Sequence, residues 1–219
     1  IIGESIIDQY VFCETIGKSG KEPILVLKEN KSEQYVGGAL AIANHLSDFF
    51  KKVSVLSMIG EKCEYLNLIN KQTRDNLNFH FIKKKNSPTI LKKRFLDEVN
   101  NSKVLGVYNL NDEEINKNEE NKFLKKIQGL KKNHCTIISD YGHGLITKKI
   151  AKYLCKHQNF IALNAQINSS NIGIHSMRKY KNIELYIINE KEIRHEFRDK
   201  VNKVEILMKK IAKQQNINL

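Results

Sequence analysis

The stretch CTIISDYGHG, residues 135–144, decides the fold class of this 219-residue chain. It begins with a nearly continuous apolar run, which is typical of a strand that is buried on both faces of a sheet. The run is followed at once by Asp140 and by two glycines that flank His143. Ligands of open α/β proteins bind at the carboxyl ends of such strands. The stretch therefore predicts a buried parallel strand that leads into a ligand-binding loop.

Similar apolar runs recur on both sides of this stretch, and segments of helical period separate them. The predicted strands are residues 52–58, 79–82, 160–163 and 185–188. The predicted helices are residues 38–50, 112–131, 147–156, 170–180 and 200–215. Because strands and helices alternate, we expect βαβ crossovers and a mostly parallel sheet, which is an α/β fold.

Four other segments alternate apolar and polar residues, as strands with one wet face do. They are residues 10–14, 24–28, 90–96 and 103–108. We expect them to form a second, small sheet apart from the main one. Its apolar face has to be covered, either by the cleft of the main domain or by the same sheet of a second copy. The second arrangement predicts a homodimer through this small sheet.

The chain carries a formal charge of +13, which often indicates a polyanionic partner. Only five of its 37 basic residues are Arg and the other 32 are Lys, and the chain is also rich in Asn and Ile. Arg is the side chain that recognition surfaces favour, and the scattered Lys lack aromatic stacking residues among them. We therefore interpret the charge as a solvated surface that suits an anionic small substrate, with no nucleic acid as partner.

The apolar runs and the cysteines restrict the class of protein further. No apolar run approaches the roughly 18 residues that a membrane span needs, so we expect no membrane partner. The chain starts at Ile1 without an initiator Met or a leader sequence, which indicates an internal fragment. Its four cysteines form no CxxC or Cys/His cluster, which favours free thiols in a reducing compartment and a cytoplasmic protein.

Two glycines and the Asp140 loop are candidate ligand-binding elements. Gly37 and Gly38 lie between an extended segment and an apolar helix, where the backbone either approaches an anionic ligand or simply turns tightly. Asp140 lies at the end of a buried strand, where a carboxylate is seldom needed for packing. His143 is either a base or a hydrogen-bonding residue of the loop.

Asn189 and Glu192 follow another buried strand and share one helix face. Oxygen ligands of this kind suit a hydrated Mg²⁺ ion that carries phosphates, and a capping box explains the same pattern equally well. The chain has no GxxxxGK[ST] loop and no GxGxxG fingerprint. A Walker-type NTPase and a standard dinucleotide enzyme are therefore disfavoured.

Five segments in this order resemble signatures of the ribokinase-like (PfkB) carbohydrate kinases, most closely the heptose 7-phosphate kinase domain of the bifunctional ADP-heptose synthesis protein. The segments are Gly3-Glu4-Ser5-Ile6-Ile7-Asp8-Gln9-Tyr10, Gly37-Gly38-Ala39 with the helix through Asn44, Thr89-Ile90-Leu91-Lys92-Lys93-Arg94-Phe95, Ser139-Asp140-Tyr141-Gly142-His143-Gly144 and Asn189 to Glu192. The resemblance spans almost the whole chain. It implies a three-layer α/β/α sandwich with a small β lid, inserted at about residues 10–36 and 88–108, and a missing C-terminal third.

The resemblance also implies a function, which is ATP-dependent phosphorylation of a sugar or sugar phosphate such as a heptose phosphate. The implied cofactors are ATP and Mg²⁺. The implied substrate-binding residues are Asp8, Gly37, Gly38, Asn44, Lys92, Arg94 and Asp140. The implied nucleotide-binding residues are Asn164, Asn189 and Glu192, of which the last two would also hold Mg²⁺. Because strand ends gather at one edge, we expect Asp8, Gly38, Asp140 and Asn189 to line one cleft.

The sequence departs from the family pattern at several places. Ala41 and Ile42 stand where the family has a sugar-contacting Asn, His143 replaces a Lys, and residues 164–171 replace a D-P-K-G segment. The G-x-G-D signature, which supplies the anion hole and the catalytic Asp base, does not occur before Leu219. We therefore expect the catalytic base beyond Leu219, and little activity from the present residues alone.

Two alternatives to a simple kinase stay open. The domain is part of a fusion with a nucleotidyltransferase, as in the bifunctional relatives that it resembles. The other alternative is a non-catalytic, decayed kinase that acts as a sugar-binding or dimerising module. The substitutions at Ala41 and His143 favour the decayed kinase, and the presence of Asp8, Asp140, Asn189 and Glu192 favours the enzyme.

Overall fold

The computed structural model describes residues 1–130, 135–168, 171–173 and 175–215. The main sheet has six strands in the order β10-β9-β8-β1-β4-β5, and all neighbouring strands are parallel. Its strands are β1 (Ile2–Gly3), β4 (Val53–Gly60), β5 (Leu77–Lys84), β8 (Thr136–Asp140), β9 (Ile161–Ala165) and β10 (Leu185–Tyr186). The five predicted buried strands are all in this sheet, and the prediction of a mostly parallel α/β fold is confirmed.

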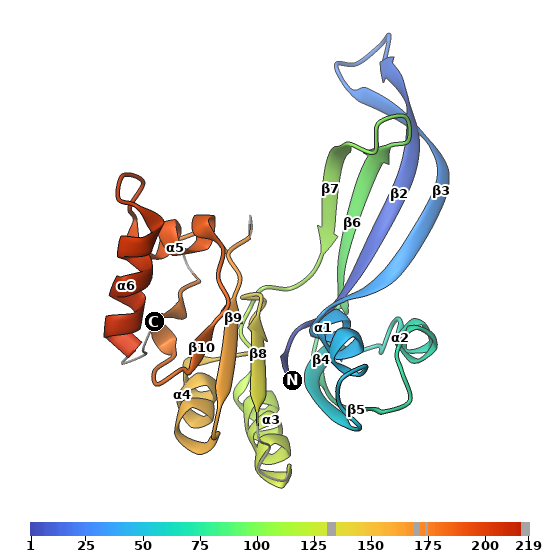
Figure 1. The fold of residues 1–219 in the computed structure, drawn as a ribbon. Coiled ribbons are helices and arrows are strands. Elements are labelled where there is room, and N and C mark those ends of the chain that lie inside the picture. The colour runs from blue at the N-terminus through green and yellow to red at the C-terminus, as the bar shows by residue number, and fades with distance from the viewer. Residues whose placement is uncertain (131–134, 169–170, 174, 216–219) are drawn as a thin grey trace.

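Helices cover both faces of the main sheet, because successive residues of a strand point to opposite faces. Val53 and Val55 of β4 pack with Ala43 of α1, whereas Leu56 and Met58 of the same strand pack into the cluster of α3 and α4. The helices are α1 (Ala39–Leu46), α2 (Leu66–Gln72), α3 (Lys117–Gly129), α4 (Lys148–His157), α5 (Glu190–Phe197) and α6 (Val204–Gln215). The expected three-layer sandwich is confirmed (Figure 1).

The second sheet has four strands in the order β3-β2-β6-β7 and rises from the main sheet as a long, curved lid (Figure 1). Its strands are β2 (Ser5–Lys18), β3 (Leu25–Gly38), β6 (Ile90–Asp97) and β7 (Lys103–Asn109). The four alternating segments are all in this sheet, so the prediction of one small separate sheet is confirmed. The strands extend beyond the predicted segments, because the β2–β3 ladder runs from the main sheet to the tip of the lid.

Large apolar side chains remain exposed on the lid. Leu105 and Val107 on β7 are 53 % and 49 % exposed, and Tyr35 on β3 is 47 % exposed. Single exposed apolar side chains are ordinary, and the homodimer through this sheet stays a prediction. No helix in the part of the chain that the structure describes has the length and apolar character needed to cross a membrane.

The prediction of a helix over residues 170–180 is wrong. Ser170 lies outside the described residues, and the described remainder contains only one 3₁₀ turn, η1 (Met177–Lys179). The Asn171 side chain accepts a hydrogen bond from the Asn168 amide and donates to the carbonyls of Tyr141 and Gln166. Such bonds between side chains and backbone compete with helical hydrogen bonds, and here they hold a loop.

Two further predictions fall on residues that the structure does not describe. The predicted helix 112–131 ends at Lys131, which lies outside the described residues, and α3 ends at Gly129. Leu219, beyond which the sequence predicts the catalytic base, also lies outside the described residues, which end at Gln215 in α6. The position of the base therefore stays a prediction.

Candidate functional site

The order of the strands places a ligand site between β1 and β8. From β1 the chain passes to β4 and β5 on one side, and it later adds β8, β9 and β10 on the other side. In open α/β sheets the crevice at such a reversal binds ligands. Gly3 pairs with Ser139, so the next residues along the two strands, Glu4 and Asp140, come together at this edge.

Asp140 is 1 % exposed, and three side chains surround its carboxylate. Lys179 Nζ lies 2.6 Å from Oδ2, and the Tyr180 hydroxyl donates to the same oxygen at 2.6 Å. His175 Nε2 lies 3.7 Å away. Burial acts to raise the pKa of Asp140, but the charges of Lys179 and His175 outweigh it, so the pKa lies below its ordinary value. Asp140 is therefore an ionised, buried carboxylate.

Glu4 is a second buried carboxyl group at this edge, with 0 % exposure. Its Oε2 accepts a hydrogen bond from the backbone amide of Tyr141 at 2.9 Å, and its Oε1 accepts one from the amide of His143 at 3.2 Å. Burial, followed by the charge of Asp140, raises the pKa of Glu4 to about 7. The two neighbouring carboxyl groups therefore have pKa values that are shifted in opposite directions.

Asp8 lies on β2, just after the chain leaves the main sheet. Arg94 on the neighbouring strand β6 donates from Nη1 to Asp8 Oδ1. A Cβ atom at Gly37 would overlap the Asp8 carboxylate, so glycine at this position leaves the space that the carboxylate occupies. The Asp8 side chain is 24 % exposed. Arg94 thus binds Asp8 directly, and Asp8 keeps an accessible face.

Gly38 joins the end of β3 to the start of α1. Its backbone φ angle of 60° is one that residues other than glycine rarely adopt. A Cβ atom at this position would also overlap the carbonyl oxygen of Glu4. That carbonyl accepts a hydrogen bond from the Ala39 amide at 2.9 Å. The glycine therefore lets the amino end of α1 lie directly against the end of β1.

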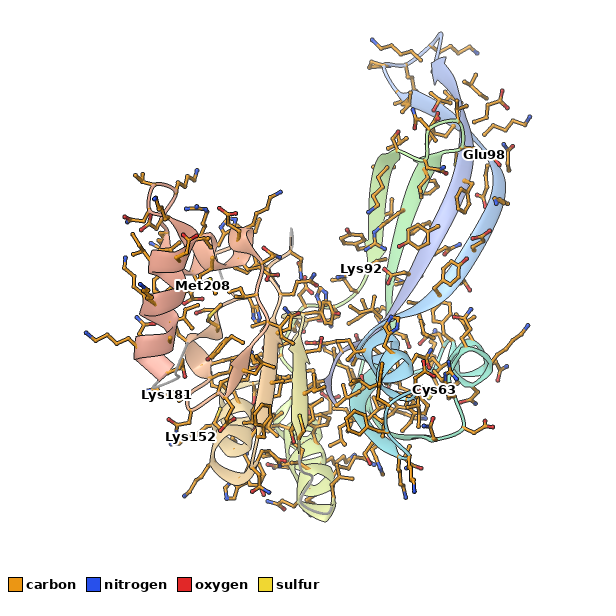
Figure 2. All side chains as sticks on the ribbon, in the orientation of Figure 1. Cys63, Lys92, Glu98, Lys152, Lys181 and Met208 are labelled. Carbon is orange, nitrogen blue, oxygen red and sulfur yellow. The ribbon has the colours of Figure 1, made fainter. Side chains whose placement is uncertain are left out.

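Lys92 is a buried ammonium group near the base of the lid, where it pairs with Asp8 in the β2–β6 ladder (Figure 2). Its Nζ lies 5.6 Å from the centroids of the Tyr108 ring and of the Tyr141 ring. Burial lowers the pKa of Lys92, and the charge of Asp8 opposes this shift. Aromatic faces stabilise a cation without neutralising it, so Lys92 remains available to a bound anion.

Tyr141 is the residue at which the segments of the site meet. Burial raises the pKa of its hydroxyl, and the charges of Glu4, Asp8 and Glu192 raise it further. These three carboxyl groups come from the end of β1, from the lid and from α5. The charges of Asp8 on the lid and of Glu192 on α5 thus reach the same loop, and the convergence of Asp8, Gly38, Asp140 and Asn189 on one cleft stays a prediction.

His143 is fully buried and connects this loop to the segment that follows β7. Its Nδ1 lies 2.6 Å from Asp112 Oδ1. Lys84 Nζ donates to the carbonyls of Asn111 at 2.7 Å, of Glu113 at 2.5 Å and of His143 at 3.4 Å. Burial lowers the pKa of His143, so its imidazole is neutral near neutral pH. This arrangement favours the loop hydrogen-bonding interpretation over the base.

Asn189 and Glu192 form a capping box at the start of α5. The Asn189 side chain accepts from the Glu192 amide at 2.9 Å, and Glu192 Oε2 accepts from the Asn189 amide at 2.9 Å. The capping interpretation of this motif is confirmed. The described residues contain no group of three or more His, Cys, Asp or Glu side chains that could hold a metal ion. A role for the two residues toward Mg²⁺ stays a prediction.

Two predicted ligand-binding residues, Asn164 and Asn44, donate side-chain hydrogen bonds to backbone carbonyls of neighbouring elements. The Asn164 amide donates to the carbonyl of Ile187 at 2.8 Å, beside β10. The Asn44 amide donates to the carbonyl of Gln72 at 2.7 Å, between α1 and α2. Both contacts join neighbouring elements of the fold. Roles for Asn164 toward a nucleotide and for Asn44 toward a sugar stay predictions.

A cavity of about 1160 Å³ lies between α4, η1 and α5, and Asp140 is at its margin. Of the four residues expected to share one cleft, only Asp140 is among the described residues that line this cavity; Asp8, Gly38 and Asn189 are not. The cavity walls are rich in basic side chains, including Lys148, Lys152 on α4, and Lys181 (Figure 2 labels the last two). The cavity therefore adjoins the loop after β8, whose Gly142 and Gly144 line it.

Several residues of this site, among them Glu4, Lys84, His175, Lys179 and Tyr180, were absent from the prediction. Glu4 stands inside a quoted motif, but nothing next to it marks a buried carboxyl group. Lys179 and Tyr180 reach Asp140 from a segment that resembled a helix, and Lys84 comes from the end of β5. The position of Lys84 at the end of a main-sheet strand is a weak signal for it. No local pattern identifies the others.

Curated relatives of this chain are found among bifunctional proteins named HldE. The chain is 29 % identical over 194 residues to the protein of Campylobacter jejuni subsp. doylei, which covers 88 % of this chain and 39 % of that protein. It is 26 % identical over 153 residues to the protein of a Nitratiruptor species, which covers 69 % of this chain and 32 % of that protein. The chain therefore spans about two fifths or less of these relatives. No family model matches it.

Solved structures of sugar kinases share the fold. Phosphofructokinase-2 of Escherichia coli superposes with a TM-score of 0.72 at 14 % identity, over 99 % of this chain and 71 % of that chain. A ribokinase of Arabidopsis thaliana complexed with ribose and ATP has a TM-score of 0.61 at 13 % identity, over 99 % of this chain and 68 % of that chain. The resemblance to the ribokinase-like (PfkB) carbohydrate kinases is confirmed, and the fold is ribokinase-like with a β lid.

Proposed function

We propose that the protein to which this chain belongs is an ATP-dependent kinase of a sugar or sugar phosphate, with a heptose phosphate as the preferred class of substrate. The observation that supports this most is the meeting of Asp8, Lys92 and Asp140 around the Tyr141 loop, at the reversal of strand order. A carboxylate with an accessible face suits sugar hydroxyls, and a cation between aromatic rings suits a phosphate group. The HldE relatives favour the heptose class.

In this proposal each side chain of the lid and of the sheet edge has a separate task. Asp8 accepts hydrogen bonds from sugar hydroxyls, and Gly37 leaves the space for its carboxylate. Arg94 holds Asp8 in place by donating to it, which leaves Lys92 as the group that attracts the anionic end of the substrate. Asp140 stays ionised at the floor of the loop.

ATP and Mg²⁺ supply the transferable phosphoryl group and neutralise its charge when they are bound. The donor set at the start of α5 fits a hydrated Mg²⁺ ion, because one carboxylate and one amide oxygen suit water-mediated binding, and the amino end of the helix favours the anionic phosphates that the ion carries. The Asn189 and Glu192 oxygens that cap the helix keep further lone pairs for such waters. Asn164 is proposed to contact the nucleotide from β9.

The catalytic base is proposed to lie beyond Leu219, because the G-x-G-D segment does not occur in residues 1–219. A base of this kind typically contributes about 10² to 10⁴ in rate, and the anion hole contributes separately. We therefore expect residues 1–219 on their own to transfer phosphate far more slowly than the full-length gene product, while weak sugar binding through Asp8 persists.

The proposal has two extensions and one rival. A nucleotidyltransferase domain fused to this kinase would account for the length of the bifunctional relatives. A homodimer would cover the exposed apolar side chains of the lid, as a cytoplasmic enzyme would require. The rival is a decayed kinase that binds sugar without phosphorylating it, and the substitution of Lys by His143 favours it.

The test is ATP turnover by the full-length gene product against a panel of hexoses, heptoses and their phosphates. Asp8→Asn should lower kcat/KM by at least a hundredfold for the best substrate, because it removes the charged acceptor of the sugar hydroxyls. Asp48→Asn, which removes an exposed partner of Arg74 far from the site, should leave turnover unchanged. Absence of turnover with every sugar, together with measurable sugar binding, would support the rival.

A further inference from the structure

Glu4 binds two residues of one loop, Tyr141 and His143, which lie 137 and 139 residues away from it in the sequence. Its two carboxyl oxygens each accept a hydrogen bond from one backbone amide of the loop after β8, and the residue has 0 % exposure. Asp140 Oδ1 accepts the intervening amide, that of Gly142, at 3.0 Å. Three consecutive amides of the loop are therefore bound by two buried carboxyl groups.

The charged and titratable groups that face Glu4 come from every element packed around it. They are Asp140 and Tyr141 from β8 and its loop, Lys179 and Tyr180 from η1 and its C-terminal cap, Lys84 from β5 and Lys92 from β6. After burial, the largest effects on the pKa of Glu4 are the charge of Asp140, which raises it, and the hydrogen bond from the Tyr141 amide, which lowers it. Glu4 is thus placed where a like charge opposes its ionisation and the loop amides favour it.

The loop that Glu4 holds also makes contacts with the lid and with the segment that leaves it. The Tyr141 ring receives Lys92 of β6, and His143 binds Asp112 in the segment that follows β7. The Ile115 amide donates to the carbonyl of Gly144 at 2.9 Å. The loop is therefore in contact with both the lid strand β6 and the segment that follows β7.

We propose that Glu4 is a positioning residue of the candidate site: its carboxyl group holds residues 141–143 in the conformation that presents Tyr141 to Lys92, and proton uptake by Glu4 loosens this hold. An ionised carboxylate accepts both amides, whereas a protonated carboxyl group carries a hydroxyl that must itself donate. The protonated form therefore cannot keep both amide bonds at full strength. Since the pKa of Glu4 is about 7, the change occurs near neutral pH.

The first experiment follows the loop directly and needs no substrate. In the full-length gene product labelled with ¹⁵N-Tyr, ¹⁵N-His and side-chain ¹³C-Glu, the Tyr141 and His143 amide resonances should shift between pH 5.5 and 8.5 with the same midpoint as the Glu4 carboxyl carbon. Glu4→Gln should abolish this titration. Ser5→Ala, which removes a buried polar side chain of the next residue whose hydroxyl contacts only the Ser57 side chain in the described structure, should keep it.

The second experiment rests on the proposed function and measures its consequence. Glu4→Gln should raise KM for the phosphorylated sugar by about tenfold to a hundredfold, which corresponds to one lost charge-assisted hydrogen bond, and should remove the inflection near pH 7 from the profile of kcat/KM. Glu4→Asp keeps the charge but shortens the side chain, so the inflection should persist at a reduced kcat/KM. Ser5→Ala should keep both the KM and the inflection.

The two experiments separate failure of this inference from failure of the proposed function. Amide resonances that ignore the ionisation of Glu4 in the wild-type protein would overturn the inference, whatever the turnover and even if Glu4→Gln does not fold. Amides that follow Glu4 in a protein that phosphorylates no sugar would overturn the proposed function and support the inference.

Discussion

The lid sheet and the carboxyl edge of the main sheet differ in how far their charged side chains are exposed to solvent. Toward the tip of the lid, ion pairs are exposed to solvent: Lys28 and Glu14 form a pair at 3.5 Å with side-chain exposures of 63 % and 60 %. At the sheet edge, Glu4 and Asp140 are buried. Glu4 accepts hydrogen bonds from amides that lie more than 130 residues later in the sequence, and Asp140 accepts one from the Tyr180 hydroxyl. Exposed pairs contribute little to stability, whereas a buried charge that loses its partner is costly. The comparison therefore predicts that substitutions have very different effects in the two regions.

The largest effect is expected when Asp140 is replaced by Ala. The substitution leaves the Lys179 ammonium, whose side chain is 16 % exposed, without its partner and leaves the Tyr180 hydroxyl without an acceptor. The free energy of unfolding should fall by about 3 to 5 kcal/mol. Glu14→Ala on the lid should change it by less than about 1 kcal/mol. Denaturant unfolding measures both, and equal effects would contradict the contrast between the regions.

A slightly smaller effect is expected from pH, through Glu4. Its pKa is raised to about 7 in the folded protein from an ordinary value near 4.5, so between these values the unfolded chain releases its proton first. The contribution of Glu4 to stability is therefore fully present below pH 4.5 and is lost as the pH rises through 7, by about 3 kcal/mol. Glu4→Gln should remove this slope. Parallel stability curves for the two proteins over pH 4.5 to 7.5 would refute the assignment.

A third prediction concerns Gly38, at the junction of the two regions. Gly38→Ala places a Cβ atom against the Glu4 carbonyl at a φ angle of 60°, and we expect a loss of about 2 kcal/mol. Gly20→Ala near the tip of the lid meets no atom within 4 Å and should change stability by less than about 0.5 kcal/mol. Thermal unfolding of both variants measures the difference, which vanishes if the junction relaxes freely.

The smallest effect on folding is expected on the exposed face of the lid. Leu105→Lys with Val107→Lys should change the stability of a single copy by less than about 0.5 kcal/mol, because both side chains are half exposed. If the lid forms the dimer interface, the same double substitution should raise the dimer dissociation constant more than tenfold in sedimentation experiments. Val99→Lys, in the turn between β6 and β7, is the control that should leave association unchanged. An unaltered dimer in the double variant would place the interface elsewhere.

Much of the fold could be predicted because its signals are local. The apolar runs at residues 52–58 and 135–139 are main-sheet strands, and the alternating segments at residues 90–96 and 103–108 are lid strands. Thr147 caps α4 through a hydrogen bond from the Ile150 amide. The helix predicted over residues 170–180 was wrong, because hydrogen bonds from the Asn171 side chain to backbone carbonyls replace helical hydrogen bonds. Periodicity does not register such bonds.

The site was less predictable than the fold. Asp8 was predicted from the family resemblance and Asp140 from its place after a buried strand, but the contact between Asp8 and Arg94, which was itself a predicted substrate-binding residue, was not predicted. Asn189 and Glu192 fitted both a capping box and a Mg²⁺ site, and the structure shows the capping box. Sequence patterns indicate which residues reach a sheet edge, and they do not indicate which of them bind each other there.

The sequence by itself determined that this chain folds into a parallel α/β sheet with a separate small lid, and that Asp140 and the glycines of its loop lie at a strand end. Only the tertiary structure decided that Glu4 is buried against that loop, that Lys179 neutralises Asp140 and that Lys92 lies between two tyrosine rings. Strand and helix periods arise from the geometry of neighbouring residues, so they can be read along the chain. Burial and charge pairing arise from which strands become neighbours in the sheet, and no local pattern contains that order.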